Sequence, residues 1–208
     1  MLMNKGDTIN FDAVANDIRV KSNCIKRNFT CLSCECKAKL FATQCNSFYG
    51  CEMMDLSSTQ FNNIVINWRK SIRYLLDLPH RTHSCLLPNI VNTPSAGSQI
   101  KSRIICFMKN GLQHDSEYVS FFFRHCIRYL NSYMAKNVYM ICRNIDINVE
   151  DITQKSIRWL KQSIKLKDTP PDWRSSMIYE LLKCRDAELD SGLNKEEIDA
   201  ILEYVCVS

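Results

Sequence analysis

The stretch from Phe61 to Pro88 limits the possible folds more than any other part of this chain. Its first half repeats apolar residues at steps of three and four, which is the period of one helix face. At about 100° per residue, Arg69, Lys70 and Arg73 fall on a flank and on the back of the same helix. The pattern predicts an amphipathic helix that packs inward and still presents a basic edge. The apolar positions are Phe61, Ile64, Val65, Trp68, Ile72, Leu75 and Leu76.

A basic turn follows this predicted helix. The helix is expected to end at Leu78-Pro79, because the residue before a proline is disfavoured in the α conformation. Arg81 then lies between two histidines, His80 and His83. The only carboxylate near these histidines is Asp77, which is too few ligands for a metal, and no nucleophile is near them. The turn is therefore expected either to hydrogen-bond locally or to contact a phosphate backbone.

The remaining sequence shows the same helical spacing of apolar residues. Five glycines and five prolines in 208 residues are few for a fold built from strands and tight turns. The apolar share of 46% is enough for a sizeable core. The predicted fold class is all-α, an irregular multi-helix bundle or two helical subdomains. The clearest linker is the segment 92–97, so we expect one helical region over 1–91 and another over 98–208.

Two glycines are predicted to end helices. A helix over 34–49 is expected to stop at Gly50, and a helix over 99–110 is expected to stop at Gly111. The reason is that glycine adopts the left-handed conformation that commonly follows the last helical residue.

Further expectations concern the C-terminal half of the chain. Asp172 and Asn194 are predicted to cap the N-termini of the last two helices, because their side-chain oxygens can accept from free backbone N–H groups. A helix over 118–133 contains three consecutive phenylalanines, Phe121–Phe123. Three adjacent residues cannot share one helix face, so this helix is expected to be buried on more than one side.

The charges are unevenly distributed along the chain. The net charge is +5. Residues 60–130 hold nine lysines and arginines against three acidic residues, whereas residues 186–208 hold seven acidic residues against one lysine. A basic middle with an acidic tail indicates a polyanionic partner for the middle. The alternative is that the basic face is solvated or pairs with the acidic helix of the tail.

The sequence shows no pattern of a signal peptide or of a membrane span. No apolar run approaches the roughly 18 residues that a membrane span requires. The N-terminus lacks the charged start and apolar stretch of a signal peptide. The 12 cysteines are therefore expected to be thiols in a reducing compartment, with the protein in the cytoplasm or nucleus and not secreted.

One group of cysteines resembles a zinc knuckle. Cys31, Cys34 and Cys36 lie close together, but a structural zinc site needs four ligands in two closely spaced pairs. The second pair could come only from Cys45 and Cys51, whose spacing is one residue too wide. We predict thiols without a metal, and a zinc module using the first three cysteines is the alternative.

No catalytic constellation is visible in the sequence. There is no Gly-rich phosphate loop, no Gly-x-Ser-x-Gly and no His-Glu-x-x-His. No aspartate pair follows an aromatic residue, as a two-metal polymerase site would require. The sequence therefore predicts no catalytic residue, no cofactor and no small-molecule substrate.

The central stretch resembles a known family. It is similar to the region after the polymerase core in reverse transcriptases of non-LTR, LINE-type (jockey-like) retrotransposons, which carry a signature of the form WRKAIRR…LP.RTHS.LLP. The resemblance is strongest for 37–88 and weaker after Leu130. The structural signature residues are Trp68, Pro79, His83 and Pro88, and the matching string is Trp68-Arg69-Lys70, Ile72-Arg73, Leu78-Pro79, Arg81-Thr82-His83-Ser84 and Leu87-Pro88.

The resemblance implies a thumb and C-terminal portion that grips RNA or DNA. It also implies an upstream polymerase palm as a partner in the parent protein. No position here matches the palm aspartates of the family, and its endonuclease domain has no counterpart. We therefore expect a nucleic-acid-contacting remnant without enzymatic activity, and the alternative is a small helical protein–protein interaction module. The residues expected to contact the nucleic-acid backbone are Arg69, Lys70, Arg73, Arg81 and Arg103.

Overall fold

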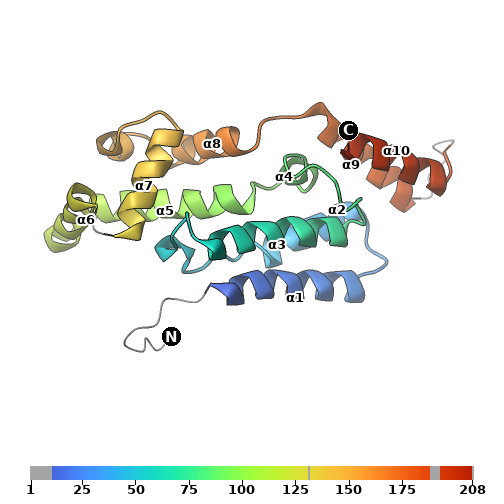
Figure 1. Ribbon diagram of the computed structural model, residues 1–208, viewed down its shortest axis with the longest axis horizontal. Helices are drawn as coiled ribbons and strands as arrows, with labels where there is room; N and C mark the ends of the chain where they lie inside the picture. The colour runs from blue at the N-terminus through green and yellow to red at the C-terminus, as the bar shows by residue number, and fades with distance from the viewer. Residues whose placement is uncertain (1–10, 131, 188–192, 208) are drawn as a thin grey trace. The chain divides into compact units, whose positions relative to one another are not determined.

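The computed structural model describes residues 11–130, 132–187 and 193–207. Within these ranges the regular structure consists of ten α-helices and two short 3-10 helices, with no strand (Figure 1). The predicted all-α fold, an irregular multi-helix bundle, is confirmed. No helix in the described ranges has both the length and the apolar character needed to cross a membrane.

The chain forms two compact units that interleave along the sequence. The first unit contains 48–62 and 96–168, and the second contains 12–47, 63–95 and the described residues from Thr169 onward. The predicted regions, 1–91 and 98–208, are instead consecutive, and each of them contributes to both units. The difference arises from long-range packing, because helices from the end of the chain pack against helices near its beginning.

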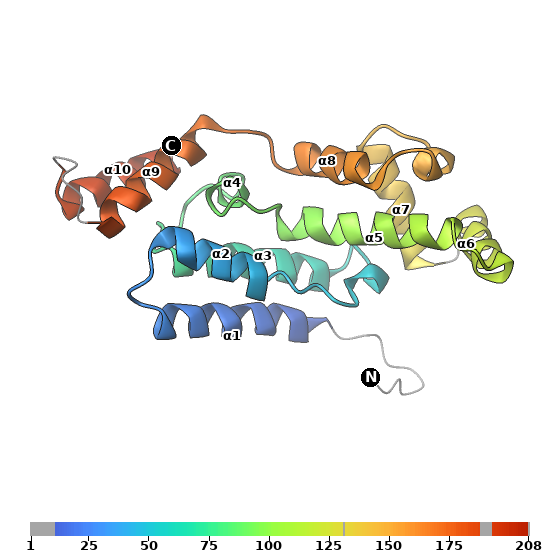
Figure 2. The ribbon, with the colours of Figure 1, turned by 180° about the vertical axis from the view of Figure 1, so that it is seen from behind.

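The first unit is built around one central helix. Helix α5 contacts every other helical element of this unit, and it lies side by side with α8 in both views (Figures 1 and 2). The buried Asn137 fixes a segment without regular structure, because its Nδ2 donates to the carbonyl of Met54 at 2.6 Å and its Oδ1 accepts from the N–H of Leu56. The elements are η1 (Cys51–Met53), α5 (Ala96–Leu112), α6 (Glu117–Tyr129), α7 (Tyr133–Asn144), η2 (Val149–Thr153) and α8 (Ile157–Asp168).

The second unit combines N-terminal helices with the two last helices of the chain. Helix α1 packs on α2, and α9 packs on α2, α4 and α10. Helix α3 begins in the first unit and belongs to the second from Asn63 onward. The elements are α1 (Asp12–Asn28), α2 (Cys34–Gln44), α3 (Thr59–Leu75), α4 (Leu87–Ile90), α9 (Trp173–Ala187) and α10 (Lys195–Val207).

The predicted caps of the last two helices are confirmed. The Asp172 carboxylate accepts from the N–H of Arg174 at 2.9 Å at the start of α9. Asn194 and Glu197 form a reciprocal capping box at the start of α10. The N–H of Asn194 donates to the Glu197 carboxylate at 2.8 Å, and the N–H of Glu197 donates to Asn194 Oδ1 at 2.9 Å. Each cap satisfies backbone donors that have no partner inside the helix.

The predicted ends of α2 and α3 are wrong. Helix α2 ends at Gln44, and Gly50, with φ of +81°, precedes η1 instead of ending α2. Helix α3 ends at Leu75, three residues before the predicted end. Asp77 adopts a left-handed conformation there, with φ of +49°, and the N–H of Leu78 reaches back to the carbonyl of Arg73 at 2.9 Å. This is a Schellman end, which satisfies helix carbonyls before the proline is reached.

Gly111 does not end helix α5, because the helix continues to Leu112. A Cβ added at Gly111 would lie 2.5 Å from three ring carbons of the buried Phe123. The glycine therefore allows α6 to pack closely on α5. The close approach of the Phe123 ring, and not a helix stop, is the reason for a glycine at position 111.

Gly111→Ala is expected to lower the free energy of unfolding by about 1–3 kcal/mol, because the ring of Phe123 must shift in a packed core. Helix propensity alone would raise stability by about 1 kcal/mol, so the sign of the change decides between the two effects. Urea denaturation measures it. Phe123→Leu removes the ring that the added Cβ would meet. The double variant Gly111→Ala/Phe123→Leu should therefore lose less stability than the sum of the losses in the two single variants. A stabilised Gly111→Ala would contradict the close contact.

The expectation that the aromatic helix is buried on more than one side is also wrong. Helix α6 packs only on α5 and α7 among the described elements, so a single face is covered. Phe123 lies on that face and is buried, whereas Phe121 and Phe122 are exposed. Of the three adjacent rings, one is therefore buried and two face solvent.

Candidate nucleic-acid interface

The basic turn after α3 is held to the helix by Arg73. Its Nε donates to the carbonyl of Thr82 at 3.1 Å, its Nη2 donates to the same carbonyl, and its Nη2 also reaches the Ser84 hydroxyl at 3.1 Å. Burial and then repulsion from the neighbouring Arg69 lower the pKa of the Arg73 guanidinium. Arg73 was predicted to contact a nucleic-acid backbone, but its donors already bind the turn.

The same turn is closed by contacts of its own residues. The carbonyl of Pro79 accepts from both the N–H and the hydroxyl of Thr82, at 3.0 and 2.6 Å. The N–H of His83 donates to the carbonyl of Cys206 at 3.0 Å, and His83 Nε2 lies 3.1 Å from the carbonyl of Val207. His83 thus joins the turn to the C-terminal end of α10. Local hydrogen bonding, one of the two predicted roles of this turn, is provided by Thr82, whereas His83 makes long-range contacts.

Trp68 forms the centre of the core beneath this basic edge. It is fully buried, packs edge-on against Phe41 with ring centroids 6.0 Å apart, and donates from Nε1 to the Asn46 side chain at 2.9 Å. Asn46 in turn donates to the hydroxyl of Thr93. The carbonyl of Pro88 accepts from the N–H of the same threonine at 2.9 Å. Trp68 and Pro88 therefore help to build the local fold.

Three predicted cations remain available to a partner. Lys70 and Arg81 are exposed and Arg69 is half-buried. None of the three makes a hydrogen bond or ion pair with the part of the chain that the structure describes. Arg69 lies close enough to Arg73 to lower its pKa, and Arg73 binds the turn that carries Arg81. We define Arg69, Lys70 and Arg81 as the turn-side cations.

The fifth predicted contact, Arg103, does not belong to this surface. It lies on α5 in the first unit and pairs with Glu52 at 3.1 Å. Its charge is therefore compensated within its own unit. The geometry groups Arg103 with the packing of η1 against α5 and not with the turn-side cations.

Among the described residues, the acidic C-terminal helix forms no ion pair with the turn-side cations. Its Asp199 pairs instead with Arg185 of α9 at 3.6 Å. Arg185 also donates to the carbonyls of Leu76 and Asp77, at 2.6 and 3.2 Å. Arg185 thus closes the C-terminal end of α3, where backbone carbonyls lack helical partners. No sequence pattern indicated this role of Arg185.

The cysteines of the zinc-knuckle pattern have different surroundings. Cys34 is buried at the start of α2, and its Sγ donates to Asp186 at 3.3 Å. Burial and the Asp186 carboxylate raise the pKa of this thiol to about 11. Cys31 and Cys36 are exposed. The described residues contain no group of three potential metal ligands.

A second basic surface was missed in the sequence, because the basic segment was counted only to residue 130. Helix α8 carries Arg158, Lys161 and Lys165 at helical steps of three and four, and all three are exposed. The exposed Trp159 lies beside them, with Lys155 Nζ 5.2 Å from its ring centroid. The spacing of these cations was visible in the sequence. We call Arg158, Lys161 and Lys165 the α8 cations.

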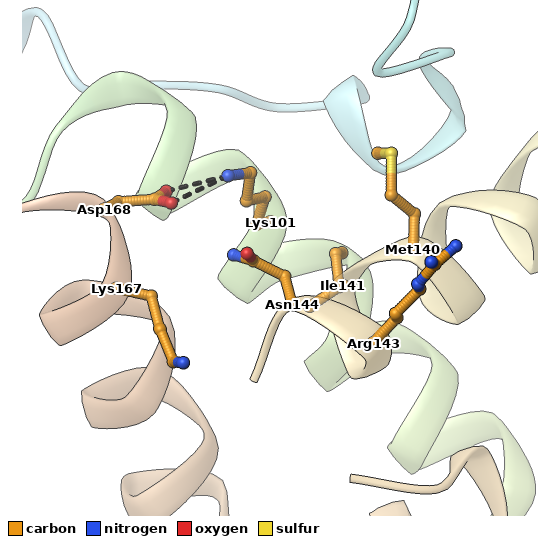
Figure 3. Close-up of a pocket in the computed structure, with 7 residues that line it drawn as sticks. All are labelled: Lys101, Met140, Ile141, Arg143, Asn144, Lys167 and Asp168. Atoms are coloured by element: carbon orange, nitrogen blue, oxygen red, sulfur yellow. Dashed lines mark hydrogen bonds and ion pairs between the residues drawn. The ribbon is translucent and has the colours of Figure 1, made fainter. Parts of the chain in front are cut away.

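The first unit also contains an open pocket of about 510 Å³ (Figure 3). Lys101 Nζ pairs with the Asp168 carboxylate at 2.8 and 3.0 Å, so this cation is neutralised. Figure 3 shows Arg143 and Lys167 pointing away from that pair. The cations do not converge on one point, and the pocket offers no built anion site. Its lining residues are Lys101, Met140, Ile141, Arg143, Asn144, Lys167 and Asp168.

Comparison with protein-family models, with curated proteins and with solved structures finds no match to this chain.

Proposed function

We propose that this chain contacts the phosphate backbone of RNA or DNA through the turn-side cations, as a remnant of a LINE-type reverse transcriptase. Its sequence carries no counterpart of the palm aspartates, so the proposed role is binding without nucleotide transfer. The observation that carries the proposal is a set of three cations without a partner among the described residues: Arg69 and Lys70 on α3, and Arg81 on the turn that Arg73 and Thr82 hold in place. The resemblance of the sequence around Trp68 to the family supports the same function.

A fixed basic turn suits backbone contact for a physical reason. Lysine and arginine side chains that neutralise phosphates release counterions, and this supplies affinity without reading sequence. Cations that are already paired would first have to break those pairs. The turn-side cations carry no such cost, in contrast to Arg73 and Arg103, whose donors are engaged.

The test is fluorescence anisotropy of labelled 20-nucleotide RNA and DNA across salt concentrations. The triple variant Arg69→Ala/Lys70→Ala/Arg81→Ala is expected to weaken binding about tenfold or more at low salt. It should also reduce the slope of log affinity against log salt by about two to three, because roughly one counterion is released per phosphate contact.

A matched control removes the same charge elsewhere in the second unit. Lys21, Lys39 and Lys183 each pair with a carboxylate on their own helix, at 2.6, 2.7 and 3.1 Å. Their triple alanine variant should leave the salt slope unchanged. If both triple variants lost the same affinity and salt slope, net charge alone would explain the loss of binding. Loss confined to alanine variants of the α8 cations would move the contact to the first unit and overturn the assignment.

A second candidate function is a helical protein–protein interaction module. The observation that favours it is the row of exposed aromatic rings on α6, which belongs to the first unit and is separate from the turn-side cations.

A further inference from the structure

Helix α6 presents an uncovered aromatic face. Tyr118, Phe121, Phe122 and Tyr129 are 89%, 67%, 58% and 59% exposed. With His125 they lie within about 100° around the helix, since each is three or four residues from another member, so they form a single stripe. The rings of His125 and Tyr129 lie 4.4 Å apart and those of Phe121 and His125 lie 6.2 Å apart. We call these five residues the α6 stripe.

The stripe is about as large as the largest apolar patches on typical monomers. At about 200 Å² per aromatic ring, its exposed area is roughly 500 Å², near the upper end for a monomer. Two such stripes facing each other would bury about 1,000 Å², the lower limit for a specific interface. In both views α6 lies at one end of α5, which leaves the side opposite α5 open within this unit (Figures 1 and 2). The area is therefore sufficient for a weak, specific dimer.

The charges beside the stripe indicate what covers it. Glu117, Arg124 and Arg128 share one flank, because seven and eleven residues correspond to two and three helical turns. The acid lies at the start of the helix and the arginines lie toward its end, about 16 Å apart between Glu117 and Arg128 at 1.5 Å per residue. Neither Glu117 nor Arg128 forms an ion pair with the described residues. The flank is thus polarised, acidic at one end and basic at the other.

We propose that the α6 stripe binds a second copy of this chain, with the two α6 helices antiparallel. When two identical helices face each other antiparallel, the two-fold axis places the same flank of each copy side by side. Glu117 of one copy then faces Arg128 of the other, and the pair occurs twice. A parallel arrangement would not bring the acidic end of one helix to the basic end of the other. Charge complementarity therefore selects both the partner and its direction.

This inference is independent of the proposed nucleic-acid contact, because no turn-side cation takes part in it. The test is sedimentation equilibrium of the full chain over a range of concentrations, with reductant present to prevent disulfides between exposed cysteines. We expect a monomer–dimer equilibrium. Glu117→Lys or Arg128→Glu alone should raise the dissociation constant about tenfold, since each change turns two attractions into repulsions. The double variant Glu117→Lys/Arg128→Glu should return it to within about threefold of the original.

A matched pair of aromatic changes tests the stripe itself. Tyr118 and Tyr49 are almost equally exposed, at 89% and 88%, but only Tyr118 lies in the stripe. Tyr118→Ala should weaken the dimer, while Tyr49→Ala should leave it unchanged; circular dichroism checks that both variants remain folded. A chain that stays monomeric at several hundred micromolar, or a double charge variant that does not recover, overturns the proposal. If single-stranded oligonucleotide binding instead depends on Phe121 and Tyr129, the stripe serves nucleic acid and not a second copy.

Discussion

The folded chain should lose stability steeply above pH 9 and unfold near pH 10–11 under reducing conditions. Burial raises the pKa of Cys34 and Cys51 to about 11 and that of Cys45 and Cys142 to about 12, from an ordinary value of 9.0. Desolvation is the largest cause in all four, because a thiolate loses its hydration when buried. The four thiols are divided equally between the two units.

The direction of the effect follows from proton linkage. Below pH 9 the four thiols are protonated in both the folded and the unfolded state, so they add no pH dependence. Above pH 9 the unfolded chain loses protons that the folded chain keeps, and unfolding therefore becomes more favourable as pH rises. Each thiol contributes about 1.4 kcal/mol per pH unit. Two thiols in each unit give about 3 kcal/mol per pH unit, which is a large fraction of a typical stability of about 5–15 kcal/mol.

Urea denaturation at pH 8, 9, 9.5 and 10 measures this slope. Cys142→Ala lowers stability at pH 8 because it empties part of the core, but it should flatten the alkaline slope by about 1.4 kcal/mol per pH unit. Cys31 is exposed, so Cys31→Ala is the matched control and should leave the slope unchanged. A slope that is equally steep in Cys142→Ala and in the unaltered chain would show that other groups cause the alkaline loss.

The fold was predictable to the extent that local patterns determine it. The inward stripe of α3 and the caps at Asp172 and Asn194 depend on neighbours within one helix, and the structure confirms them. The interleaved units could not be predicted, because they depend on which distant helices pack together. Gly111 shows the same limit. Its role is set by the ring of Phe123, twelve positions away, whereas local reasoning could offer only a helix stop.

The candidate site was predictable only in part, because counting cations treats each of them as surface charge. The sequence pattern led to the end of α3 and the basic turn, where Arg69, Lys70 and Arg81 have no partner among the described residues. Arg73 was in the same count but binds the turn, and Arg103 pairs with Glu52. Whether a cation faces solvent or a backbone carbonyl is a property of tertiary packing, so periodicity cannot decide it.

Lys109 was also counted among the basic residues of the middle segment, but it is buried. It lies on α5 and is buried, with Nζ donating to the carbonyls of Ile152, Thr153 and Lys155 at 3.2, 2.7 and 2.9 Å. Among the described residues this ammonium group binds carbonyl oxygens and no carboxylate. These oxygens lie at and just beyond the end of η2, where carbonyls have no helical N–H partner. The ammonium group thus caps the C-terminal end of η2 and holds η2 against the central helix α5.

Lys109→Met should therefore lower the free energy of unfolding by about 3–5 kcal/mol at pH 7. Methionine keeps most of the apolar stem and avoids a large cavity, but it leaves three carbonyls without their charged donor. Lys161→Met on the exposed face of α8 is the control and should change stability by less than about 0.5 kcal/mol. Hydrogen exchange should show the loss of protection beginning around residues 149–156, because η2 is the element released first. If Lys109→Met costs less than about 1 kcal/mol, water replaces the ammonium group and the contact does not hold η2 in place.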